Sequence, residues 1–224
     1  MARDPVNFQR ARRPEHKRQR QAAILAAART LGLREGVRNV SLADIAAEVG
    51  VHKTALLRYF GTREEIYLEL AAEAWEEWAS TMCVELAGLP TGSVAEVAST
   101  FAHTLDARPF LCDLLTHAPL NLERNVSLTA VLTFKVTVLA AVGDIVNGLR
   151  ETLPDLTERD GWDLVTGVNA IAAGLWQICH PPAAVNTLYQ ENPKIAHAYP
   201  AFVPTLTRLT ETLVLGMRAR HTEG

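Results

Sequence analysis

Residues 41–60 read SLADIAAEVGVHKTALLRYF, and this stretch decides the fold of the N-terminal part of the chain. Two short helical patterns flank Gly50, a residue that adopts the left-handed backbone of a tight turn without steric cost. Ala46 is small enough for the second helix to cross the first closely. Val51 and Leu56 are expected to fill the core that the two helices share. This arrangement predicts a helix-turn-helix.

The second helix of this motif, predicted over residues 52–59, carries side chains suited to reading DNA. A recognition helix presents hydrogen-bond donors and small apolar groups to base edges in the major groove. Lys53 and Arg58 suit guanine, and Thr54 can touch a thymine methyl group. The candidate base-contacting residues are His52, Lys53, Thr54, Ala55, Leu57 and Arg58. The candidate phosphate-contacting residues, which fix register rather than sequence, are Ser41, Tyr59, Thr62 and Arg63.

Charge is distributed unevenly along the chain. Residues 1–63 carry 13 Lys and Arg against 5 Asp and Glu, whereas residues 64–224 carry 9 against 20. The formal net charge of −3 therefore conceals a basic head on an acidic body. This asymmetry predicts a polyanion-binding module joined to a second domain, with a merely solvated basic arm as the alternative.

Three runs carry a resemblance to a known family: AAILAAARTLGLREG at residues 22–36, SLADIAAEVGV at 41–51 and TALLRYFGTREEIYLEL at 54–70. With them, the segment from residue 17 to about residue 75 resembles the DNA-binding domain of the tetracycline-repressor (TetR) family of transcriptional regulators. Three positions depart from the family pattern. Leu57 stands where the family usually has a tyrosine, Arg63 where it usually has lysine, and Gly61 where it has a bulkier residue.

The remaining sequence predicts an all-α fold, because helical spacing recurs and sustained strand-like alternation does not. Residues 1–16 are expected to form a flexible basic arm, residues 17–62 the helix-turn-helix domain, and residues 63–224 a helical effector-binding and dimerisation domain. The predicted helices of this last domain cover about residues 63–85, 93–106, 109 onward, 127–152, 157–179 and 205–220. A Pro-punctuated connection is expected over residues 181–204.

Two late helices carry small and apolar residues at helical spacing. Periodicity alone leaves open whether they pack within the chain or form a dimer seam. The resemblance favours the dimer, because the last two helices of the family pair into a four-helix bundle. The candidate dimer residues are Gly167, Ala170, Ile171, Gly174 and Ile178 on one helix, with Leu206, Leu209, Leu213 and Met217 on the other.

Aromatic residues are spread over the helices of the second domain. Each one singly is better explained as ordinary core, since aromatic side chains bury much area. The resemblance implies a ligand cavity in this domain, and some of the set are expected to border it. The candidate effector-pocket residues are Trp75, Phe101, Phe110, Phe134 and Trp176.

Other kinds of site find no support in the sequence. It holds none of the common nucleotide-binding, hydrolase or metalloprotease motifs, so we predict no catalytic residue, cofactor or metal site. The cysteines Cys83, Cys112 and Cys179 are widely spaced, which suits a reducing cytoplasm and buried thiols. The N-terminus lacks the apolar core of a secretory signal, and no run of about 18 apolar residues predicts a membrane span.

We therefore predict a cytoplasmic, ligand-responsive regulator, most simply a repressor. It would bind a pseudo-palindromic operator as a homodimer and be released by a small-molecule effector. The first alternative is a nonspecific DNA-binding protein, which would bind operator-like and random duplexes equally. The second is a helical enzyme with a basic accessory domain.

Overall fold

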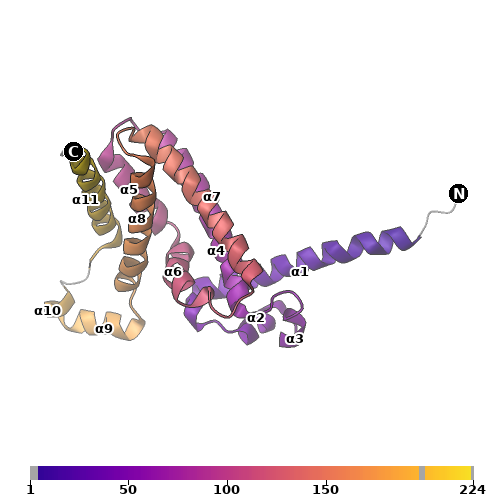
Figure 1. Cartoon of the computed structure of the whole chain (residues 1–224). Coiled ribbons are helices and arrows are strands. Elements are labelled where there is room, and N and C mark those ends of the chain that lie inside the picture. The colour runs from indigo at the N-terminus through magenta and orange to yellow at the C-terminus, as the bar shows by residue number, and fades with distance from the viewer. Residues whose placement is uncertain (1–4, 197–199, 223–224) are drawn as a thin grey trace. The chain divides into compact units, whose positions relative to one another are not determined.

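The computed structural model describes residues 5–196 and 200–222, and every regular element in these ranges is helical. Figure 1 shows the elements in order. The chain divides into two compact units, Met1–Leu70 with His117–Leu132 and Ala71–Thr116 with Thr133–Gly224. This division differs from the predicted boundary at residue 62. The unit that holds the helix-turn-helix also includes the start of the fourth helix, up to Leu70, and the later segment His117–Leu132.

The first unit is built on α1 (Pro5–Glu35), a turn of 3-10 helix (Val37–Asn39), α2 (Leu42–Val49), α3 (Lys53–Leu56) and the start of α4 (Arg63–Ala87). Its core contains Ile24, Ile45, Leu56 and Ile66, none of which has any exposed surface. Gly36 follows the end of α1 with φ 82°, a conformation that favours glycine.

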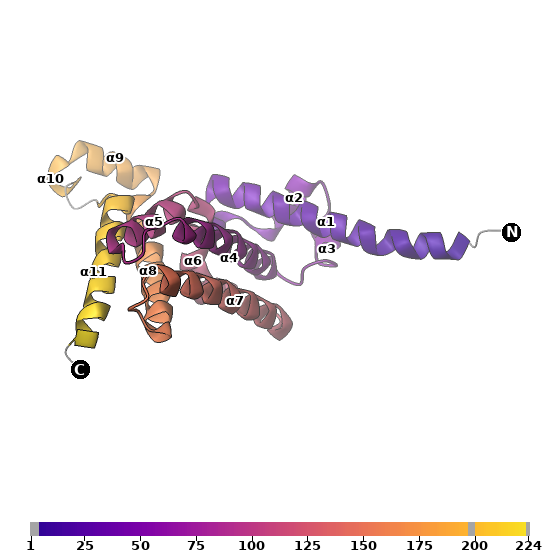
Figure 2. The same ribbon diagram turned by 90° about the horizontal axis from the view of Figure 1, so that it is seen from above.

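The helix α1 begins earlier than predicted. Residues 5–16, expected as a flexible arm, are helical, and the N-terminal half of α1 runs on past α2 and α3 (Figure 2). Pro5 suits the first helical position, because its fixed φ is already helical and its missing N–H would have had no partner there. Once residues 17–35 are helical, each added residue extends an existing helix rather than nucleating a new one.

The second unit contains the rest of α4, α5 (Val94–Asp106), α6 (Pro109–His117), most of α7 (Leu128–Thr152), α8 (Glu158–Cys179) and α11 (Phe202–Thr222). The helix α11 packs against both α5 and α8, and Figure 1 shows α8 and α11 side by side. Between α6 and α7, a short helical turn spans Ala118–Leu122. The region predicted as an irregular connection instead holds α9 (Ala183–Glu191) and α10 (Pro193–Ala196).

The end of α11 is fastened to the start of α8. Thr157 and Asp160 form a reciprocal capping box at the N-terminus of α8. The Asp160 carboxylate also lies 2.7 Å from Nε2 of His221, near the end of α11. Burial raises the pKa of Asp160, but the hydrogen bonds from Thr157 and His221 outweigh it and hold that pKa below its usual value.

One helix in the described ranges, α7, is long and apolar enough by length and composition to cross a membrane. The sequence analysis predicted no membrane span because it considered only uninterrupted apolar runs. The mean hydropathy of α7 is high enough even though the helix contains threonines and a few charged residues. Within the second unit α7 buries Phe134, Ile145 and Leu149 and exposes Asp144 and Arg150. It also leaves Val136 and Leu139 more than half exposed, so only part of its apolar surface lies in the core.

Candidate nucleic-acid interface

The turn between α2 and α3 has the geometry that residues 41–60 predict. The Asp44 N–H donates to Oγ of Ser41 at 3.2 Å, and the Ser41 N–H donates to Oδ2 of Asp44 at 2.8 Å. Gly50 has φ 73° and ψ 35°, which is the left-handed conformation. The Val51 N–H then donates to the Ala46 carbonyl at 2.9 Å, which closes the turn across the small residue. These bonds fix the angle at which the chain enters α3.

The recognition helix is shorter than the predicted span of residues 52–59. Regular α-helix covers Lys53–Leu56, and the chain continues as tight turns in which the Arg58 N–H donates to the Ala55 carbonyl at 3.3 Å. Such three-residue bonds are common where a helix tightens at its end. Leu56 and Phe60, which are 0% and 4% exposed, anchor the middle and the end of this segment to the core.

The predicted base-contacting residues lie on the outside of this segment. His52, Lys53, Thr54, Leu57 and Arg58 are exposed, and Ala55 is half-buried. Leu57 is 44% exposed although it is apolar and adjoins fully buried Leu56. The segment thus presents two cations, a hydroxyl group and an apolar side chain to solvent, which is the chemistry that base edges in the major groove accept.

His52 has a structural role that the sequence analysis missed. Its Nδ1 accepts the Thr54 N–H at 3.4 Å and lies 3.0 Å from the Thr54 hydroxyl, so His52 is the N-cap of α3. Its position directly before the helix could have indicated this, although Ser, Thr, Asp and Asn are the usual caps.

Three of the four candidate phosphate contacts keep some exposed surface. Ser41 is exposed, and Tyr59 and Thr62 are half-buried. The Thr62 hydroxyl accepts the Glu65 N–H at 3.1 Å, so it caps α4. The Glu65 carboxylate turns elsewhere and accepts the N–H groups of Gly61 and Ser127, at 2.8 and 3.0 Å. Hydrogen bonds from Ser127 hold the pKa of Glu65 below its ordinary value.

The fourth candidate, Arg63, turns its donors to the protein in this structure, and its phosphate contact stays an untested prediction. Its Nε and Nη2 donate to the backbone carbonyls of Val40 and Val37, and its Nη1 lies 3.1 Å from the Glu64 carboxylate. The guanidinium also lies 4.8 Å from the centre of the Tyr67 ring, and only 17% of the side chain is exposed. Its donors are directed to the protein because the turn between α1 and α2 presents backbone carbonyls to it.

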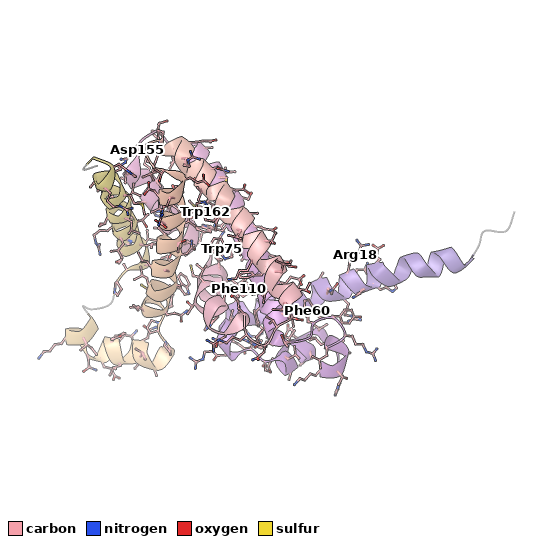
Figure 3. All side chains as sticks on the ribbon, in the orientation of Figure 1. Arg18, Phe60, Trp75, Phe110, Asp155 and Trp162 are labelled. Carbon is pink, nitrogen blue, oxygen red and sulfur yellow. The ribbon has the colours of Figure 1, made fainter. Side chains whose placement is uncertain are left out.

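The exposed cations of α1 extend the positive surface of the first unit. Lys17, Arg18 and Arg20 are exposed, and Figure 3 labels Arg18 on the part of α1 beyond α2 and α3. The side chains of Arg10, Arg12 and Arg13 lie outside the described residues.

The five candidate effector-pocket residues are all buried, at 0–9% exposed. Figure 3 labels two of them, Trp75 and Phe110, within the second unit. Trp75 stacks edge-on against Trp78, with ring centroids 5.3 Å apart, and Trp176 packs edge-on against Phe202 at 5.2 Å. These contacts are those of core aromatics, and the effector role of the five residues remains a prediction.

A hollow of about 610 Å³ lies between α4 and α7 in the second unit, and none of the five candidates lines it. Its lining includes the carboxylates Glu76, Asp144 and Glu151. The pKa of Cys83, which lies there, is raised by burial and by the nearby Asp144 and Glu151, so its thiol stays protonated at neutral pH. Burial also raises the pKa of Cys112, to about 12.

The candidate dimer residues separate into two groups. Leu206 and Met217 are 0% and 6% exposed within the single chain, so their side chains lie in its core. They are buried because α11 packs on α5 as well as on α8. The others keep exposed surface: Gly167, Ala170, Ile171, Gly174, Ile178, Leu209 and Leu213.

In the described part of the chain, no group of three or more His, Cys, Asp or Glu side chains is placed to hold a metal ion. The chemistry available in the first unit is therefore that of an exposed cationic surface on a rigid helical core.

Two family models match the chain. Residues 24–70 match the family described as bacterial regulatory proteins, tetR family. Residues 72–221 match the family described as tetracyclin repressor-like, C-terminal domain. No curated protein matches the chain by sequence.

Solved structures share the fold at low sequence identity. FadR from Thermus thermophilus, in complex with lauroyl-CoA, has a TM-score of 0.56 and 14% identity, covering 87% of this chain and 93% of that one. The fatty acid degradation regulator FadR from Bacillus halodurans has a TM-score of 0.55 and 13% identity, covering 87% and 97%. The TetR-family regulator PfmR, also from Thermus thermophilus, has a TM-score of 0.52 and 18% identity, covering 86% and 96%.

Proposed function

The chain belongs to the TetR family of DNA-binding transcriptional regulators, and we propose that it acts in the cytoplasm as a homodimeric repressor released from its operator by a small-molecule effector. Members of this family are regulators and not enzymes.

The observation that carries the proposal is the exposure of Lys53, Thr54 and Arg58 on a segment that buried Leu56 and Phe60 hold to the core at its middle and at its end. Side chains on a rigid segment reach base edges with little loss of conformational freedom. We assign base contacts to His52, Lys53, Thr54, Ala55, Leu57 and Arg58. We assign phosphate contacts to Ser41, Tyr59 and Thr62.

Two copies are proposed to meet through the exposed faces of α8 and α11. Ala170, Gly174, Ile178 and Leu209 are exposed there, and a Cβ atom added at Gly174 would meet no neighbouring atom within 4 Å. Small residues on an exposed apolar face let a partner helix approach closely. A two-fold dimer would then pair two recognition segments with two half-sites of a pseudo-palindrome, roughly one DNA turn apart or more.

The experiment that tests the proposal is selection of bound duplexes from a random pool by the full-length protein. We expect a two-fold symmetric consensus that binds at least about 1000-fold more tightly than a shuffled duplex of the same composition. Equal affinity for both duplexes would establish the nonspecific DNA-binding protein instead. Lauroyl-CoA is a suitable first effector to add to the complex, because a structural neighbour was solved with it.

A further inference from the structure

The first turn of α4 contains a charged side chain that the proposed DNA contacts do not use. Arg63 donates to the carbonyls of Val37, the first residue of the turn of 3-10 helix between α1 and α2, and of Val40, which directly follows that turn. Val40 is followed directly by Ser41, the N-cap of α2. The guanidinium therefore binds the chain at the point where it enters the helix-turn-helix.

Tyr67, the residue against which Arg63 packs, is itself held in place. Its guanidinium lies over the ring of Tyr67, which is fully buried and whose hydroxyl donates to the Ala28 carbonyl of α1 at 3.2 Å. The side chains of Val37 and Val40 are 0% and 1% exposed, so neither end of the connection can swing freely. One side chain thus ties α4 to the turn before α2, against a residue anchored on α1.

From this geometry we propose that Arg63 is a positioning residue, which sets the orientation of the α2–α3 pair for operator reading without contacting DNA. The inference rests on the proposed operator-binding function. A planar guanidinium can donate in two directions at once and stack on a ring, whereas a lysine ammonium is a point charge on a flexible stem. Arg63 is therefore not replaceable by lysine, although lysine preserves the charge.

The test compares Arg63→Lys, Arg63→Gln and Arg63→Ala in the full chain. A phosphate contact predicts that lysine preserves binding, and that glutamine and alanine each flatten the salt dependence by about one unit of slope. A positioning role predicts that lysine fails as glutamine does, and that the slope stays that of the wild type. Arg38, which is exposed on the same turn, provides the matched control Arg38→Lys.

Two measurements are made on each variant. The first is affinity for the wild-type-selected duplex and for its shuffled counterpart at several salt concentrations. We expect Arg63→Lys to lose roughly ten-fold or more on the selected duplex, as expected for broken charged hydrogen bonds, and much less on the shuffled one. The second is amide hydrogen exchange at residues 40–44 without DNA, which we expect to become faster in Arg63→Lys and to stay unchanged in Arg38→Lys.

Wild-type affinity and exchange in Arg63→Lys would overturn the proposal, as would a salt slope reduced by about one unit in Arg63→Gln. If the wild type prefers no duplex, the proposed operator function fails. The positioning of residues 40–44 is then decided by hydrogen exchange alone, and unchanged exchange would refute it. Glutamine keeps a neutral hydrogen-bond donor at position 63. Arg63→Gln can therefore still be compared with Arg63→Lys if Arg63→Ala does not fold.

Discussion

At the scale of single residues, the proposed function depends on which basic side chains of the first unit remain exposed to DNA. Lys53 and Arg63 are both basic and only ten positions apart, yet Lys53 is exposed on α3 and Arg63 is bound to backbone carbonyls. The difference arises because Arg63 starts a helix beside a turn whose carbonyls accept its hydrogen bonds, whereas Lys53 begins a helix that faces solvent.

Lys53→Ala tests the base-contact assignment. We expect it to weaken binding to the selected duplex by about 1–3 kcal/mol and to relax the base preference at one position of each half-site. Lys194→Ala, at an exposed lysine of α10, is the control. Equal losses on selected and shuffled duplexes would show that Lys53 binds phosphate instead.

Asp160→Asn tests the fastening of α11 to α8. Because the folded pKa of Asp160 is depressed, its carboxylate stabilises the fold above the ordinary value of 3.8, and this contribution is lost as pH falls through the lower folded value. We expect the variant to unfold at pH 7 with about 1 kcal/mol less free energy, as for a lost N-cap. The gap to the wild type should close in acid.

The control for this measurement is Asp163→Asn on the same helix. Asp163 is more than half exposed and lies 3.9 Å from Arg159, an exposed pair of little energetic value. Chemical denaturation between pH 7 and pH 3 follows all three proteins. A loss in Asp160→Asn that stays constant over that range would exclude a role for the carboxylate charge.

At the scale of elements, α8 has one buried face and one exposed face. Its buried face holds Leu164, Val168 and Ala172 against the chain's own core, and its other face exposes Ala170 and Gly174. The helix α11 is likewise divided, because Leu206 packs inward while Leu209 is 37% exposed. The dimer surface that we propose therefore uses the residues of the two helices that keep exposed surface, and not Leu206 or Met217.

Gly174→Glu separates folding from assembly. A Cβ atom at this exposed position meets no neighbour within 4 Å, and replacing a mid-helix glycine favours the helix by up to about 1 kcal/mol. We therefore expect a monomer at least as stable as the wild type, with much weaker binding to the two-half-site duplex. Sedimentation measures the assembly, with Val84→Glu on α4 as the exposed control. A Gly174→Glu protein that remains dimeric would place the interface elsewhere.

At the scale of the whole molecule, regulation requires that DNA and effector favour different states of the same dimer. Coupling between two sites is reciprocal, so an effector that weakens operator binding by a given factor must bind the operator complex more weakly by that factor. We expect lauroyl-CoA, or the compound that replaces it, to bind free protein more tightly than the complex. Calorimetric titration with and without the selected duplex measures this, and equal affinities alongside operator release would contradict the repressor model.

Local features of this protein were predictable from its sequence. The left-handed turn at Gly50 and the buried Leu56 both follow from interactions within a few residues of one another. Spacing of this kind also made the family resemblance visible. The helix-turn-helix and its exposed cations therefore needed no knowledge of the rest of the chain.

Only the tertiary structure decided where side chains meet partners that are distant in sequence. Arg63 binds carbonyls more than twenty positions away, Leu206 and Met217 are covered because α11 packs on α5, and the candidate aromatics lie in the core. Periodicity shows which residues share a face of a helix, but it does not show what covers that face. The packing of helices that are distant in sequence determines what covers each face. In this protein, that packing buries some of the basic and apolar candidate residues in the fold and leaves others exposed, where we propose that they contact DNA or a second copy.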